Sequence, residues 1–124
     1  MITEDYCSFE VAKLLKEKGF DEKVMTYYED GILCHGHWYK WNRSPLGHIA
    51  ASTHQMAMKW LKEVHNILLF ILPAQENGKL VYLVEVWTWN EEEGIYESTY
   101  APIPRKEPEH AIEAALKYTL ENLI

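Results

Sequence analysis

Residues 67–90 read ILLFILPAQENGKLVYLVEVWTWN, and this stretch decides the expected fold. Ile67–Leu72 is apolar at every position, which predicts a central strand covered at least partly on both faces. Asn77-Gly78 is a turn sequence because Gly accepts positive φ, and it leads into a second strand over Leu80–Trp89. The stretch therefore predicts two adjacent strands at the centre of a sheet.

Local patterns place the other elements on either side of these strands. A helix is predicted over Ser8–Lys18, since Ser8 suits an N-cap and Gly19 suits a left-handed helix end. The remaining predicted elements are strands over Val24–Tyr28, Ile32–Trp41 and Ile95–Tyr100, a loop over Asn42–Gly47, and helices over Thr53–His65 and Pro108–Leu123. The order α-β-β-α-β-β-β-α predicts an α+β fold, with an about five-stranded, mostly antiparallel sheet and three helices packed chiefly on one face. The middle helix makes a right-handed crossover if the strands on either side of it are parallel.

Size and charge limit the classes of protein to consider. The chain has 124 residues without repeats or linkers, which predicts one domain over residues 1–124. Its net charge is −7, from 12 basic and 19 acidic residues. This balance argues against a nucleic-acid partner, which requires clustered Lys and Arg. The acidic N-terminus does not resemble a signal peptide, and the apolar run ending at Ala74 is far shorter than the ~20 residues that span a bilayer. We therefore expect a cytoplasmic protein without a membrane partner.

Motifs for catalysis or cofactor binding are absent from the sequence. It contains no Gly-rich phosphate loop, nucleophile elbow or HExxH helix, so no cofactor and no catalytic residue is predicted. Cys34 and His35 are adjacent on a predicted strand and point to opposite faces, which rules out a thiol–imidazole hydrogen bond between them. A pairing of Cys7 with a histidine that is distant in the sequence stays open, and a small buried apolar role is the alternative for either cysteine. Reduced thiols are expected for Cys7 and Cys34, and a single bridge between them stays open.

Three helical segments resemble proteins of one group. The segments Ser8–Phe20, Trp60–Ile67 and Ala111–Ile124 resemble short proteins of gut anaerobic bacteria and of their phages and prophages. The resemblance covers under half of the chain, and the strands between the helices are not part of it. It implies a cytoplasmic protein from a mobile element, and it carries no activity, cofactor or catalytic residue.

His35-Gly36-His37 is the best metal candidate in the sequence. Strand residues two apart point to the same face, so both imidazoles can reach one ion such as Zn²⁺ or Ni²⁺. A complete site needs at least a third ligand, for which His48, His54, Glu85 and Cys7 are the candidates. The alternative is a solvated strand face, with Gly36 marking a bulge or a close backbone approach.

The most informative feature is the number of aromatic residues on strands. Helices on one face of a sheet leave the other face to water or to a partner, and strand alternation divides the rings between the two faces. Glu85 shares a face with Trp87 and Trp89, where it marks either a site or the solvent side. The predicted binding surface consists of Trp38, Tyr39, Trp41, Glu85, Trp87, Trp89, Tyr96 and Tyr100.

Three functions are compatible with these observations. The first is a non-enzymatic protein-binding domain that uses the aromatic sheet face, with a second copy of the chain as one candidate partner. The second is a metal-binding or small-ligand-binding protein, conceivably an enzyme, that uses His35 and His37. The third is an acidic phage-type inhibitor that mimics nucleic acid, which requires carboxylates arranged in a stripe.

Overall fold

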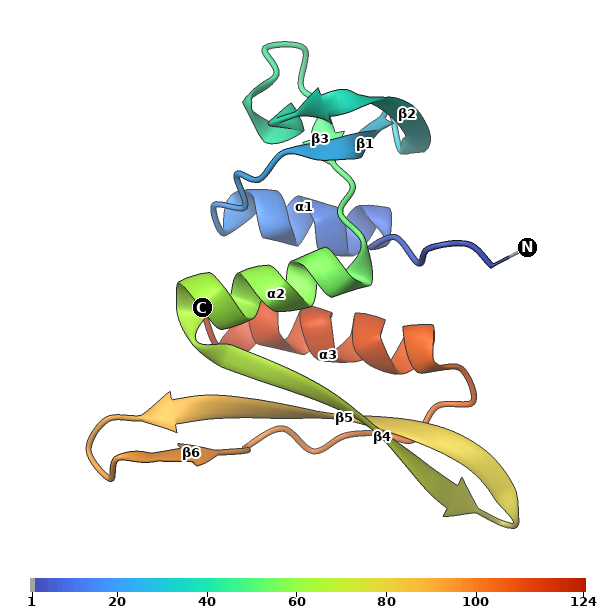
Figure 1. The fold of residues 1–124 in the computed structure, drawn as a ribbon, viewed down its shortest axis with the longest axis vertical. Helices are drawn as coiled ribbons and strands as arrows, with labels where there is room; N and C mark the ends of the chain where they lie inside the picture. The colour runs from blue at the N-terminus through green and yellow to red at the C-terminus, as the bar shows by residue number, and fades with distance from the viewer. Residues whose placement is uncertain (1) are drawn as a thin grey trace. The chain divides into compact units, whose positions relative to one another are not determined.

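The computed structural model describes residues 2–124, which form an α+β fold with three α-helices and two separate three-stranded antiparallel sheets (Figure 1). The helices are α1 (Phe9–Glu17), α2 (His54–His65) and α3 (Pro108–Asn122), with a short 3-10 helix η1 (Trp41–Arg43). The strands are β1 (Val24–Glu29), β2 (Ile32–Tyr39), β3 (Ile49–Ala50), β4 (Ile67–Glu76), β5 (Lys79–Asn90) and β6 (Ile95–Glu97). The chain divides into two compact units, Met1–Ala57 and Met58–Ile124, called the N-terminal and C-terminal units below. The boundary lies inside α2, and the prediction of one domain stays a prediction.

Helix α1 has the ends that its sequence predicts. The Ser8 hydroxyl accepts a hydrogen bond from the backbone N–H of Val11 at 3.2 Å, which satisfies a first-turn donor. Gly19 has a φ of +93°, and the backbone N–H of Phe20 donates to the carbonyl of Leu15 at 2.9 Å. These are the conformation and the hydrogen bond of a Schellman ending, so the predicted end is confirmed.

The sheet of the N-terminal unit has the order β2-β1-β3. Asp30 and Gly31 both have positive φ and join β1 to β2 in the predicted hairpin. Tyr28 lies on the side of β1 that faces α1, where its ring meets the Phe9 ring at 5.4 Å. Tyr27 lies on the other side, stacked on Trp41 with ring centroids 4.1 Å apart. Both faces of β1 are therefore covered within this unit.

Gly36 lies at an irregularity of β2. The register between β1 and β2 shifts between the pairs Val24–Tyr39 and Thr26–His35, so Gly36 is in the bulged segment. A Cβ atom at Gly36 would lie 2.7 Å from Cζ2 of Trp41 and 3.0 Å from Cε1 of Tyr27. The predicted bulge and the predicted close approach are both present, since a ring packs directly on the glycine backbone.

Gly36→Ala is expected to destabilise the protein by about 1–3 kcal/mol, because the added methyl group overlaps the Trp41 and Tyr27 rings. Urea unfolding followed by circular dichroism measures this change. Cys34→Ala, on the same strand, is the control and is expected to change stability by less than about 1 kcal/mol. Equal stabilities of the Gly36→Ala variant and the unmodified protein would contradict the close packing of Trp41 on β2.

The C-terminal unit contains the sheet β4-β5-β6, with β5 in the centre. Strands β4 and β5 pair without a register shift from Ile67–Thr88 to Glu76–Lys79, and Asn77 and Gly78 form their turn with positive φ. Helix α3 packs mainly against β5. Val84 and Val86, each 1% exposed, lie on the face of β5 that forms the core with α3. The apolar side of α3 carries the buried residues Ala111, Ile112, Ala115, Leu116, Thr119 and Leu120.

The prediction of a single five-stranded sheet is wrong. The residues described form two sheets, and the strands before and after α2 belong to different ones, so no crossover joins them. β3 was not predicted, because its two residues are too few to form a periodic pattern. Ile67–Leu72 was expected in the centre of a sheet, whereas β4 is an edge strand on which Phe70, Ile71 and Leu72 are exposed. β4 also continues through Pro73, which an edge strand accommodates.

Two strands end before their predicted ends. β2 ends at Tyr39, and Trp41 begins η1. β6 ends at Glu97, so Tyr100 lies in the connection to α3. Among residues 2–124, no helix is long and apolar enough to cross a membrane.

Candidate binding surface

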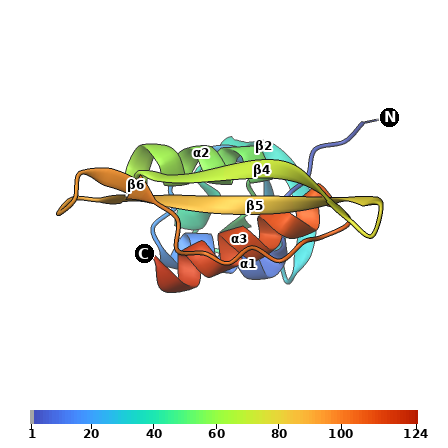
Figure 2. The same ribbon diagram turned by 90° about the horizontal axis from the view of Figure 1, so that it is seen from below.

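One face of the β4-β5-β6 sheet carries several large side chains and no helix. Directly paired residues lie on the same face of a sheet, so Phe70 shares a face with Glu85, and Tyr96 shares a face with Trp89. Glu85 and Trp89 are four residues apart on β5, so all four side chains lie on one face. Val84 and Val86, of opposite parity, lie on the face that packs against α3. Figure 2 shows the sheet from the side opposite α3. We call this side the aromatic face and define it by Leu68, Phe70, Leu72, Glu85, Trp87, Trp89 and Tyr96.

The rings of the aromatic face are partly open to solvent. Phe70 is 48% exposed and Trp89 is 42% exposed, whereas Leu68 and Trp87 are half-buried. The rings of Trp89 and Tyr96 meet edge to face with centroids 5.0 Å apart. The Tyr96 hydroxyl donates a hydrogen bond of 2.7 Å to Oδ1 of Asn66, the residue before β4. Tyr96 therefore contacts both Trp89 and Asn66, and Trp89 packs on Tyr96.

Glu85 is the one charged residue of the aromatic face. It is half-buried and lies directly opposite Phe70, with Trp87 next to it on the same side of β5. Over the residues that the structure describes, no Lys or Arg nitrogen lies within 4.0 Å of its carboxylate. The face thus combines apolar rings with a carboxylate that has no ion-pair partner in this part of the chain.

The predicted binding surface is divided between the two units. Glu85, Trp87, Trp89 and Tyr96 lie together on the aromatic face. Tyr100 is half-buried, and its ring lies 4.7 Å from that of Tyr118 on α3. Burial raises the pKa of the Tyr100 phenol above its usual value. The remaining predicted residues, Trp38, Tyr39 and Trp41, belong to the N-terminal unit.

Trp38 and Trp41 differ strongly in exposure. Trp38 is 61% exposed, whereas Trp41 is 8% exposed and lies on η1. Nε1 of Trp41 donates hydrogen bonds to the carbonyls of Val24 at 2.9 Å and His37 at 3.2 Å. Trp41 was predicted as part of a binding surface, but these contacts make it a core residue of the N-terminal unit.

His48, a candidate third metal ligand in the sequence, is buried next to Trp41. The His48 ring contacts Tyr27 and Trp41, with centroid distances of 4.6 and 5.4 Å. Its Nδ1 shares a hydrogen bond of 2.8 Å with Oγ of Ser44, and its Nε2 lies 3.9 Å from a carboxylate oxygen of Glu29. The Ser44 hydroxyl also accepts from the backbone N–H of Leu46, so this group closes the loop after η1.

A salt bridge on the other side of the same loop fixes η1. The Arg43 guanidinium makes two hydrogen bonds to the Asp21 carboxylate, one of them 2.8 Å from Nε to Oδ1. The hydrogen bond from Arg43 lowers the pKa of Asp21. Because the pair is exposed, it contributes little to stability.

His35 and His37 lie on either side of the Gly36 bulge. The His35 ring is 6.4 Å from that of Tyr6, whereas His37 contacts Tyr39 and Trp41 at 6.0 and 5.3 Å. Both side chains are exposed. In the described part of the chain, neither belongs to a group of three His, Cys, Asp or Glu residues close enough to share an ion. Metal binding by His35 and His37 stays a prediction.

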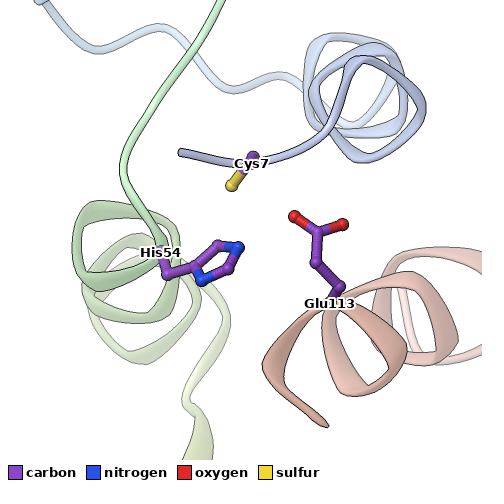
Figure 3. A group of neighbouring side chains, drawn as sticks. All are labelled: Cys7, His54 and Glu113. Carbon is purple, nitrogen blue, oxygen red and sulfur yellow. The ribbon is translucent and has the colours of Figure 1, made fainter. Parts of the chain in front are cut away.

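Cys7 and His54 are close neighbours in the N-terminal unit, as Figure 3 shows. The Cys7 sulfur and a ring nitrogen of His54 lie within 4.8 Å of each other, and both residues are buried. The Cys7 sulfur also lies 3.5 Å from Oγ of Ser52, and the backbone N–H of His54 donates to the carbonyl of Asp5 at 2.9 Å. Glu113, also labelled in Figure 3, is a residue of α3 in the C-terminal unit. Neither Cys7 nor Cys34 forms a disulfide, so the bridge that the sequence left open between them is not formed.

Comparison with known proteins assigns neither a family nor a function to these residues. No protein-family model, curated protein or solved structure matches the chain. The resemblance of the helical segments to proteins of gut bacteria and their phages therefore stays a prediction, and a function has to be argued from the surface itself.

Proposed function

We propose that this protein is a non-enzymatic protein-binding domain whose contact surface is the aromatic face of the β4-β5-β6 sheet. The partner is a protein surface that combines aliphatic side chains with at least one Lys or Arg. The observation that carries the proposal is the exposure of ordered aromatic rings on a sheet face without a covering helix in its unit.

The rings favour a protein partner for two reasons. Clustered exposed apolar side chains mark interaction sites more often than isolated ones do. Trp and Tyr also contribute much of the free energy of binding at interfaces, because they bury a large area and lose little conformational entropy. Trp89 and Tyr96 already contact each other, so binding orders these side chains less than it would two free rings.

Glu85 determines the charge of the partner. Covering the aromatic face removes water from this carboxylate, and burying an ion without a counter-charge costs several kcal/mol, on the order of the whole gain from one large side chain. A Lys or Arg supplied by the partner offsets this cost, and its cation also interacts favourably with the Trp87 or Trp89 ring. Two copies packed face to face would bring two carboxylates and no cation, so a different, basic protein fits better.

The experiment selects short peptides from a random display library on the immobilised protein. Enriched peptides are expected to combine aliphatic residues with Lys or Arg. Their affinity is then measured by calorimetry for the unmodified protein and for the Trp89→Ser and Glu85→Gln variants. Trp89→Ser is expected to weaken binding by at least about tenfold, the effect of losing an interface hot spot. Glu85→Gln is expected to reduce the preference for basic peptides.

The control is Trp38→Ser, which removes an exposed Trp from the N-terminal unit instead. This variant is expected to bind the peptides as well as the unmodified protein does. Peptides that bind the Trp89→Ser variant with full affinity, or a selection that enriches none, would contradict the proposal.

A further inference from the structure

The outer edge of β4 can be derived from the hydrogen bonds of β5. The backbone N–H of Tyr82 donates to the carbonyl of Arg105 at 2.8 Å, and the N–H of Arg105 donates back at 3.0 Å. Both backbone groups of Tyr82 therefore point away from β4. Its partner on β4 is Pro73, so this pair is one of the non-hydrogen-bonded pairs of the ladder.

The pattern alternates along β4, which fixes the direction of every backbone group. The backbone carbonyl of Pro73 points away from β5. The backbone N–H and C=O groups of the residues two, four and six positions before it therefore also point away from β5, and these residues are Ile71, Leu69 and Ile67. β4 is the outermost strand of its sheet, so the N–H and C=O groups of these residues lie at the open edge. Pro73 has no N–H to offer there, and the usable edge therefore covers Ile67–Ile71.

Apart from Pro73, this edge lacks the features that usually prevent pairing with another strand. Edge strands are commonly short, bulged or charged. β4 has ten residues in a continuous register with β5, and Ile67–Leu72 contains no charged residue. α3 packs mainly against β5 rather than β4, and Phe70, Ile71 and Leu72 are exposed. The edge is thus open to pairing and to side-chain contact from Leu69 to Leu72, whereas Ile67 at its start is 4% exposed and has to be uncovered for pairing.

We propose that β4 pairs antiparallel with β4 of a second copy of this chain, in a two-fold symmetric register centred on Leu69. Leu69 then lies opposite its own equivalent, and Ile67 lies opposite Ile71 of the partner. Each of these pairs exchanges two hydrogen bonds, and no pair includes Pro73. The hydrogen bonds of this pairing come from the backbone of β4 and do not involve Glu85, Trp89 or Tyr96, so the proposal stands independently of the proposed function.

A second copy fits this edge better than an arbitrary strand. Both sides of β4 are apolar over Ile67–Leu72, so the added strand must be apolar at every position, and the chain itself contains such a strand. Two-fold pairing also uses both open edges at once and stops at the dimer. In this register Leu68 lies opposite Phe70 of the partner, so the aromatic faces of both copies join into one surface and Glu85 stays open to solvent.

Sedimentation velocity tests the proposal with two lysine variants of the full chain. The unmodified protein is expected to sediment as a dimer at concentrations of about 0.1 mM, which suffices for micromolar affinity. Ile71→Lys places a charge at the edge and is expected to give a folded monomer, because Ile71 is exposed in the single chain. Leu80→Lys, at a position on the central strand β5 that is also exposed (56%, against 42% for Ile71), is expected to remain dimeric. Circular dichroism verifies that both variants are folded.

A cross-linking experiment tests the register. In a Cys34→Ser background, Leu69→Cys is expected to form a disulfide-linked dimer on mild oxidation, because Cα atoms of a hydrogen-bonded pair lie about 5.5 Å apart. Leu80→Cys in the same background is expected to form none. A monomeric unmodified protein, a dimeric Ile71→Lys variant or equal cross-linking of both cysteine variants would overturn the proposal. Peptide binding by the monomeric Ile71→Lys variant tests the aromatic face separately.

Discussion

Trp41→Ala is expected to lower the free energy of unfolding by about 3–5 kcal/mol, the range for removing a large buried aromatic side chain. The indole is 8% exposed and contacts four rings, those of Tyr27, His37, Tyr39 and His48. It also packs against the backbone of Gly36. Alanine leaves a cavity on this side of β1 and removes the donor that Nε1 provides to the carbonyls of Val24 and His37. After loss of the indole, the His48 ring still covers part of Tyr27, but a side chain as large as that of Trp41 leaves a space that its neighbours fill only in part.

Urea unfolding followed by far-UV circular dichroism measures the effect of Trp41→Ala. Trp38→Ala is the matched control, since it removes the same side chain three positions earlier, where it is 61% exposed. This change is expected to stay within about 0.5 kcal/mol, as for most surface substitutions. A similar loss for both variants would mean that Trp41 does not form the core of the N-terminal unit.

Features with local causes could be predicted from the sequence. The two ends of α1 depend on Ser8 and on Gly19, and both form as predicted. The hairpin turns at Asp30-Gly31 and Asn77-Gly78 require positive φ at both positions, which these residues adopt with little cost. In each case the residues that determine the structure are neighbours in the sequence.

The arrangement of the strands could not be predicted in the same way. Ile67–Leu72 is apolar on both sides, and this pattern is the same for a central strand and for an edge strand that continues an apolar face. The strand order of the sheet distinguishes an edge strand from a central one, and in this order β4 has a single neighbour, β5. Trp41 follows Trp38-Tyr39 after a single Lys, and no Gly or Pro there marks the end of β2 at Tyr39.

The residues of the aromatic face could be predicted where the alternation of side chains along one strand is enough to assign them to a face. Glu85, Trp87 and Trp89 are two residues apart along β5, and the continuous register keeps them on one face. Phe70 and Leu72 were missed, because a central strand would have covered them. Trp38, Tyr39 and Trp41 were included because a single sheet was expected, whereas they belong to the other sheet and the other unit.

Val84→Asp is expected to cost more than about 4 kcal/mol, because it buries a carboxylate without a partner. Val84 is 1% exposed and lies on the face of β5 that packs against α3. The Asp side chain meets the apolar side of α3 there, which carries Leu116 and Leu120 and offers no cation. The C-terminal unit is expected to lose its cooperative unfolding transition in urea or to unfold before denaturant is added.

The matched variant is Trp89→Asp, which places the same charge on the same strand but on the aromatic face. Trp89 is 42% exposed, so the new carboxylate reaches water, and the expected cost is below about 1.5 kcal/mol, mainly from the lost contact with Tyr96. Comparing the losses of stability caused by Val84→Asp and Trp89→Asp shows which face of the sheet belongs to the core. If Trp89→Asp were as destabilising as Val84→Asp, the aromatic face would be part of the core of a single chain. It would then be unable to receive a partner protein without unfolding.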